Sequence, residues 1–215
     1  MARSNKPLMG GWAILDVDYP VSSTKEEATT VTTYHIYRAW FDMLRRVKDS
    51  KFHVTNPSYE GVAVADDWRR FSMFQAWAEP LFVNGFQLDK DIIKTGNKLY
   101  CPEFCAFVPP FINKSFVKNK NTGQHPFGVY FKKQAKKFCA QGYDFYTRKR
   151  KFLGYFTCDL SAHKAWQEHK ISTMTEMLFN YEQQVGYDSR VGVAIKARIA
   201  KIENDFVNGV ETNYF

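Results

Sequence analysis

Residues 126–156 restrict the fold of this chain more than any other stretch. They read PFGVYFKKQAKKFCAQGYDFYTRKRKFLGYF, in which three short aromatic or alternating runs are separated by basic turns. Runs of this length and composition are typical of β-strands. From Asp159 on, Ala162, Ala165 and Trp166 recur at helical spacing. We therefore predict a three-stranded antiparallel sheet that packs on one helix.

The positive charge of the chain is concentrated in the same region. The formal net charge is +8, and residues 120–170 hold 11 Lys or Arg against 3 Asp or Glu, so the rest of the chain is balanced. A cationic surface attracts polyanions, because each neutralised phosphate releases counterions. Charge alone leaves two alternatives open: a solvated basic hairpin without a nucleic-acid role, and a basic face that docks on an acidic protein.

The region also resembles a known DNA-binding domain. The run from GVYFKKQAKKFCAQ to KRKFLGYFTCDLSAHKAW is similar to the domain of plant APETALA/ethylene-response factors and of its relatives in phage homing endonucleases. The matching positions are Gly128, Val129, Phe131, Lys137, Phe138, Ala140, Leu153, Gly154, Phe156, Thr157, Ala162, Ala165 and Trp166. The resemblance implies double-stranded DNA as the partner, read by the strands. The DNA-binding residues would be Tyr130, Lys132, Lys133, Lys136, Lys137, Gln141, Tyr146, Arg148, Lys149, Arg150 and Lys151.

Two amphipathic helices are predicted before this region. The first spans residues 30–48, where Ile36, Trp40 and Leu44 fall on one face. The second spans residues 63–81 and has an aromatic stripe that we interpret as core.

The stretch LDKDIIKTGNKLYCPEFCAFVPPFIN, residues 88–113, resembles the ββα-metal motif of phage HNH endonucleases. Further matches upstream are Trp40, Met43, Arg46, Gly61, Val62, Val64, Trp68, Phe71 and Phe74. By this resemblance, Asp89 and Asn113 take the places of the two metal ligands. Lys90 stands where the general-base His belongs, and Phe104 where the orienting Asn belongs.

These departures predict that the nuclease centre is degenerate. A lysine is protonated at neutral pH unless burial depresses its pKa strongly, so Lys90 is a weak catalytic candidate. Asp91 is a second weak candidate, because a carboxylate of ordinary pKa is a poor base. An alternative interpretation gives Asp89, Asp91 and Asn97 a structural role only, in which their side chains form turns by hydrogen bonding to nearby backbone groups. For Asp89, turn residue and metal ligand stay open as alternatives.

We therefore expect an α+β protein with an HNH-like ββα module preceded by helices, then the three-stranded sheet on one helix, and a C-terminal helix. The predicted divisions are an N-terminal extension (1–30), the HNH-like module (31–118), the DNA-binding domain (119–170) and a helical segment (171–215) that could pair with a second copy. No long apolar run predicts a membrane span. The expected location is the cytoplasm, which is that of the host if the chain is phage-encoded.

We expect a DNA-binding protein that reads a sequence or acts as a regulator. It would be a relative of homing endonucleases that has lost its nuclease activity. Binding would need no cofactor. One alternative is an active DNA endonuclease or nickase, which would need Mg²⁺ or another divalent metal. A second alternative is a phage factor that binds a host protein through its basic face.

Overall fold

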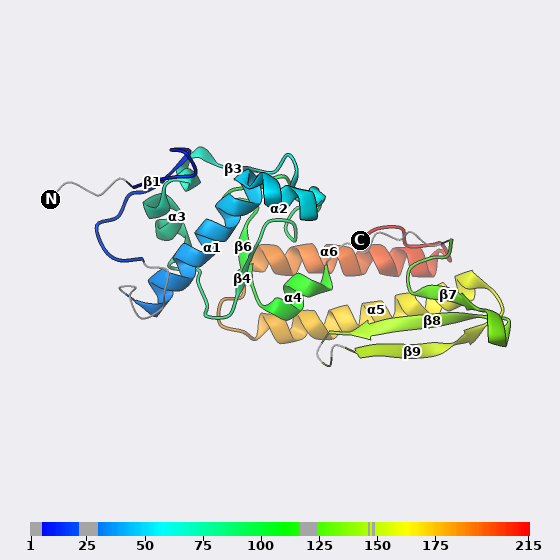
Figure 1. Cartoon of the computed structure of the whole chain (residues 1–215). Helices are drawn as coiled ribbons and strands as arrows, with labels where there is room; N and C mark the ends of the chain where they lie inside the picture. The colour runs from blue at the N-terminus through cyan, green and yellow to red at the C-terminus, as the bar shows by residue number, and fades with distance from the viewer. Residues whose placement is uncertain (1–5, 22–29, 117–123, 146, 148) are drawn as a thin grey trace. The chain divides into compact units, whose positions relative to one another are not determined.

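The computed structural model describes residues 6–21, 30–116, 124–145, 147 and 149–215. The chain divides into two compact units, Met1–Pro110 and Phe111–Phe215, which we call the N-terminal and C-terminal units. Helices and small sheets occur together, and a helix lies near the C-terminus, so the predicted α+β class and C-terminal helix are confirmed. Figure 1 shows these elements along the chain.

The N-terminal unit is built around helices α1 (Val31–Lys48) and α3 (Phe71–Ala78). The Thr30 hydroxyl caps α1 by accepting from the backbone N–H of Thr33 at 3.0 Å. Ile36, Trp40 and Leu44 are fully buried, as the helical spacing predicted. Helix α2 (Ser50–Thr55) and the 3₁₀ turn η1 (Pro57–Tyr59) follow α1.

Three short pairs of strands complete the N-terminal unit. Strands β1 (Lys6–Leu8) and β2 (Ala13–Leu15) are antiparallel, and β3 (Ala63–Val64) is parallel to β5 (Leu99–Tyr100). Strands β4 (Gln87–Asp89) and β6 (Ala106–Val108) are antiparallel.

One expectation for this unit was wrong. The helix predicted over residues 63–81 is divided into β3, the 3₁₀ turn η2 (Asp66–Arg69) and α3. The division arises because Ala63 and Val64 pair with β5 and Arg70 is extended, with φ −100° and ψ 130°. Within the described residues 6–21, Ala13 and Val21 are buried in the same core as α1 and α3.

The C-terminal unit contains the predicted three-stranded antiparallel sheet. Its strands are β7 (Val129–Lys132), β8 (Lys137–Asp144) and β9 (Lys149–Phe156), in the order β7-β8-β9, with the 3₁₀ turn η3 (Lys133–Ala135) between the first two. Helix α4 (Pro110–Ser115) precedes the sheet in the chain, and α5 (Asp159–Glu182) and α6 (Ser189–Val207) follow it.

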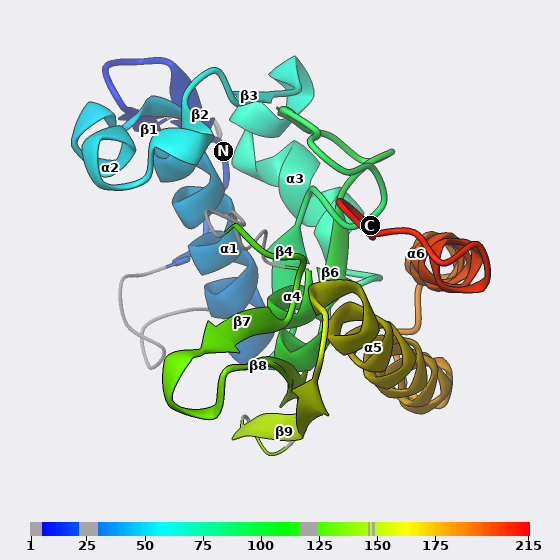
Figure 2. The same cartoon turned by 90° about the vertical axis from the view of Figure 1, so that its right-hand side faces the viewer.

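Helix α5 lies between the sheet and α6, as Figures 1 and 2 both show. It packs against all three strands and against α6. The predicted boundary between residues 170 and 171 therefore falls inside one continuous helix. Within the described ranges, no helix is both long and apolar enough to cross a bilayer.

Candidate nucleic-acid interface

The sheet of the C-terminal unit has an inner face toward α5 and an outer face on the opposite side. Gly142 of β8 fixes the assignment, because a Cβ built on it would lie 1.8 Å from Cδ2 of His169 in α5. Side chains alternate along a strand, so Cys139, Gln141 and Tyr143 belong to the outer face.

Strand pairing extends the outer face to both neighbours of β8, since residues directly opposite one another share a face. In register, Cys139 lies between Tyr130 and Tyr155, Gln141 is opposite Phe152, and Tyr143 is opposite Arg150. Lys132 and Lys137 are also opposite one another at one end of the β7–β8 pair.

A β-bulge decides which residues of β9 reach this face. Ala140 pairs with Gly154 and Gln141 with Phe152, so Leu153 is an extra residue in β9. An extra residue reverses the alternation beyond it. Arg150 and Phe152 consequently join Tyr155 on the outer face, whereas Lys149 and Lys151 belong to the inner face at the sheet edge.

The structure thus brings only part of the predicted DNA-binding set together. The outer face of the sheet gathers Tyr130, Lys132, Lys137, Gln141 and Arg150. Lys133 and Lys136 belong to the β7–β8 turn. Lys149 and Lys151 point to the other face. Tyr146 and Arg148 lie outside the described residues.

Exposed aromatic side chains occupy the same outer face, and three of them were missing from the predicted set. Tyr143, Phe152 and Tyr155 are 44, 57 and 42% exposed, and Tyr130 is 43% exposed. The sequence of β9 hides this grouping, because the bulge at Leu153 brings Phe152 and Tyr155, three residues apart, to the same face.

Lys132 is held at the edge of this aromatic surface by the hydroxyl of Tyr155. Its Nζ donates to the Tyr155 hydroxyl at 2.9 Å and lies 5.5 Å from the centre of the Tyr155 ring. The hydrogen bond to Tyr155 raises the pKa of Lys132 above its usual value. Lys132 is therefore a fixed cation at neutral pH, beside an exposed ring.

The predicted catalytic residues, Lys90 and Asp91, lie in the loop between β4 and β5. Oδ1 of Asp89 accepts from the backbone N–H of Asp91 at 2.8 Å and of Ile92 at 2.7 Å. Burial raises the pKa of Asp89, although these two hydrogen bonds act against the rise. Asp89 therefore makes the contacts expected of a turn residue, one of the two alternatives left open.

Lys90 is a hydrogen-bond donor in this loop. Its buried Nζ donates to Oδ2 of Asp91 at 2.7 Å and to the backbone oxygen of Asn97 at 2.8 Å. The side chain of Asn97 also bonds to this loop, because its Nδ2 donates to the backbone carbonyls of Lys90 at 2.9 Å and of Leu99 at 2.6 Å.

The residues at Asp89 do not fit the divalent metal that the endonuclease resemblance implies. Such cations take six or more oxygen ligands, among them carboxylates. Here one oxygen of Asp89 closes a turn, and the neighbouring side chain is an ammonium group. Across the described ranges, no three His, Cys, Asp or Glu side chains lie together in a metal-binding arrangement. The second predicted ligand, Asn113, lies in α4.

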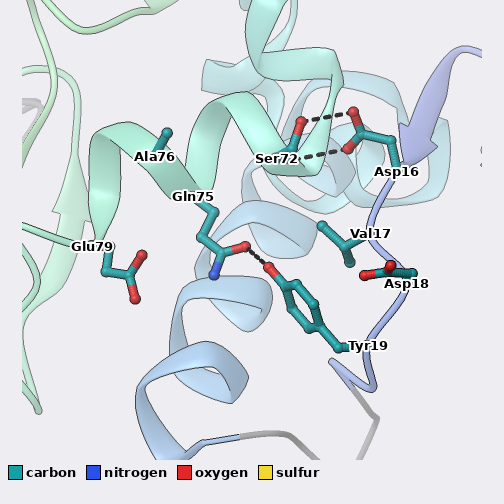
Figure 3. A pocket seen from close by; sticks show the side chains of 8 residues that line it. All are labelled: Asp16, Val17, Asp18, Tyr19, Ser72, Gln75, Ala76 and Glu79. Atoms are coloured by element: carbon teal, nitrogen blue, oxygen red, sulfur yellow. Dashed lines mark hydrogen bonds between the residues drawn. The ribbon is translucent and has the colours of Figure 1, made fainter. Parts of the chain in front are cut away.

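A separate pocket lies in the N-terminal unit between residues 16–19 and α3, as shown in Figure 3. Asp16 accepts from the backbone N–H and the hydroxyl of Ser72, and the Tyr19 hydroxyl donates to Gln75. Asp18 and Glu79 add two more carboxylates to the lining. This acidic lining repels phosphate, so the pocket is not a candidate for nucleic acid.

No protein-family model, curated protein or solved structure matches this chain. The geometry of the C-terminal sheet is therefore the main support for a functional assignment.

Proposed function

We propose that this protein binds DNA through the outer face of β7, β8 and β9. One observation carries the proposal: exposed aromatic rings and the cations Lys132, Lys137 and Arg150 share one face of a sheet whose other face packs on α5. Cations neutralise phosphates and aromatic rings contact bases or sugars, so their combination on one surface suits a nucleic acid.

The net charge of the sheet region also favours a polyanionic partner. Residues 129–156 hold eight Lys or Arg against one Asp. Lys133 and Lys136 in the β7–β8 turn extend the positive surface beyond Lys132 and Lys137. A sheet fixes the backbone positions of Lys132 and Lys137, which lowers the conformational entropy that is lost on binding.

We further propose that residues 88–113 descend from an HNH-type ββα module that has lost its chemistry. The antiparallel pair of β4 and β6, with α4 next in the chain, supports the relation. The donor role of Lys90 and the turn role of Asp89 support the loss. The ancestry suggests a regulatory or sequence-reading role.

The binding test is a fluorescence anisotropy titration of the full chain with labelled duplex and single-stranded DNA at 50 and 200 mM salt. We expect binding at 50 mM that weakens at least tenfold at 200 mM, because phosphate contacts depend steeply on salt. Absence of binding to both DNA forms at 50 mM would overturn the proposal and leave an acidic host protein as the better partner.

The loss of chemistry is tested with supercoiled plasmid in the presence of Mg²⁺ or Mn²⁺. We expect no nicking above a protein-free control. Nicking that disappears in Asp89→Ala and Asn113→Ala, with the fold intact by circular dichroism, would instead identify an active metal-dependent endonuclease.

A further inference from the structure

The centre of the outer face is aromatic, and its cations stand at the two ends. Tyr130, Tyr155 and Phe152 surround Cys139 and Gln141 of the central strand. Lys132 and Lys137 lie at one end of this group, and Arg150 lies beyond Phe152 at the other. The centre of the face therefore presents ring surfaces, and its charge is peripheral.

The side chains of Tyr130, Phe152 and Tyr155 form an aromatic surface on this face, which we call the platform. Cys139 is fully buried although it belongs to the outer face, and it lies between its pairing partners Tyr130 and Tyr155. The rings of Phe152 and Tyr155 have centroids 5.0 Å apart and meet edge to face, with 62° between their planes. The platform therefore continues from β7 across β8 to β9, with substantial ring surface left in contact with solvent.

Such a platform matches the faces of bases and not their edges. In a duplex the base faces are stacked on one another, and only the edges are open to the grooves. Reading edges needs donors and acceptors at the centre of the interface, where this face offers mainly rings, with Gln141 as the central amide. An unpaired strand exposes its base faces, which stack on aromatic side chains.

We propose that the outer face binds single-stranded DNA, with bases stacked on Tyr130, Phe152 and Tyr155 and with phosphates held by the cations at either end. This inference rests on the proposed function and specifies the form of DNA. It departs from the duplex that the family resemblance implies. From Lys137 to Tyr143 the outer face runs over six residue steps of β8, or about 20 Å, which gives room for several nucleotides.

The test compares labelled oligo(dT) of twenty nucleotides with a twenty-base-pair duplex of mixed sequence, using the full chain at one salt concentration. We expect oligo(dT) to bind at least tenfold more tightly. Phe152→Leu should weaken oligo(dT) binding about fivefold to 150-fold, the range of one lost base-stacking contact.

Phe179→Leu is the matched control, because Phe179 is an equally exposed phenylalanine, 62% against 57%, on α5 of the same unit. We expect its affinity for oligo(dT) to equal that of the wild type. Circular dichroism establishes that both variants are folded.

The outcomes separate the two proposals. Duplex binding as tight as or tighter than oligo(dT) binding overturns the single-strand inference and leaves DNA binding intact. Unchanged oligo(dT) affinity in Phe152→Leu also overturns it. Absence of binding to both oligonucleotides at low salt overturns the proposed function itself.

Discussion

At the scale of single residues, Asn97 closes the loop between β4 and β5. It is 8% exposed, donates to two carbonyls and accepts from the backbone N–H of Leu99 at 3.1 Å. We expect Asn97→Ala to lower the free energy of unfolding by about 1–3 kcal/mol, because buried backbone groups lose their partners. Urea denaturation measures the change. A loss below about 0.5 kcal/mol would contradict the structural role of this side chain.

Gly142 is a second position where one residue decides the packing. Its Cβ-free backbone lets α5 approach β8, since an added methyl would meet the ring of His169. We expect Gly142→Ala to destabilise the chain by about 1–3 kcal/mol through overpacking. Gln141→Ala, on the opposite face of the same strand, is the control and should leave the unfolding midpoint nearly unchanged. Equal effects in the two variants would contradict the assignment of faces.

The sequence predicts the roles of single residues better than it predicts the face of the sheet to which their side chains point. The turn roles of Asp89 and Asn97 could be expected, because Asx side chains close local backbone bonds. The direction of Lys149 and Lys151 could not be expected, because one bulged residue, Leu153, reverses the alternation in β9.

At the scale of elements, the segment after α6 packs on α5 through a contact between Thr212 and His163. This contact requires the neutral form of the histidine. His163 is fully buried; its Nδ1 lies 3.0 Å from the Phe127 carbonyl, and its Nε2 accepts the backbone N–H of Thr212 at 3.0 Å. Burial lowers the pKa of His163 below its ordinary value of 6.5. A proton on Nε2 would remove the acceptor that Thr212 requires.

This arrangement predicts that stability falls in acid. Because the pKa is lower in the folded chain than in the unfolded chain, the stabilisation is complete above about pH 6.5 and is lost as pH falls through the folded pKa. We expect His163→Gln, which keeps one acceptor and one donor, to lose less stability than the wild type between pH 7.5 and 5.5. Urea titrations at both values measure the difference. An equal loss in both proteins would show that His163 is not responsible.

Elements differ in how far the sequence predicts them. Strands β7, β8 and β9 and helices α1, α5 and α6 have enough residues for a period of two or of 3.6 to be visible. Strands β3 and β5 have two residues each, which is too few for any period. Their pairing depends on contacts between residues 63–64 and 99–100, far apart in the chain.

At the scale of the whole molecule, the two units differ in charge. Residues 111–215 hold 17 Lys or Arg against 9 Asp or Glu, whereas residues 1–110 hold 13 of each. The entire net charge therefore belongs to the unit with the candidate interface. We expect the isolated segment 111–215, once circular dichroism shows it folded, to bind oligo(dT) within about threefold of the full chain. The segment 1–110 should not bind at the same salt concentration. Comparable binding by 1–110 would contradict this division.

The central claim, that DNA lies on the outer face of the sheet, is tested most directly by two neighbouring residues of β9. Arg150 belongs to the outer face and Lys149 to the inner face, and both are exposed. Arg150→Gln and Lys149→Gln each remove one positive charge. The two positions are adjacent and differ mainly in the face of the sheet to which the side chain points.

The measurement is the salt dependence of oligonucleotide affinity for the two variants. We expect Arg150→Gln to weaken binding about five- to tenfold at 0.1 M salt. The slope of log affinity against log salt concentration should fall by the contribution of about one phosphate contact. Lys149→Gln should change affinity by less than about twofold, because its charge points away from the strand. Equal losses in both variants, or the larger loss in Lys149→Gln, would contradict binding at the outer face.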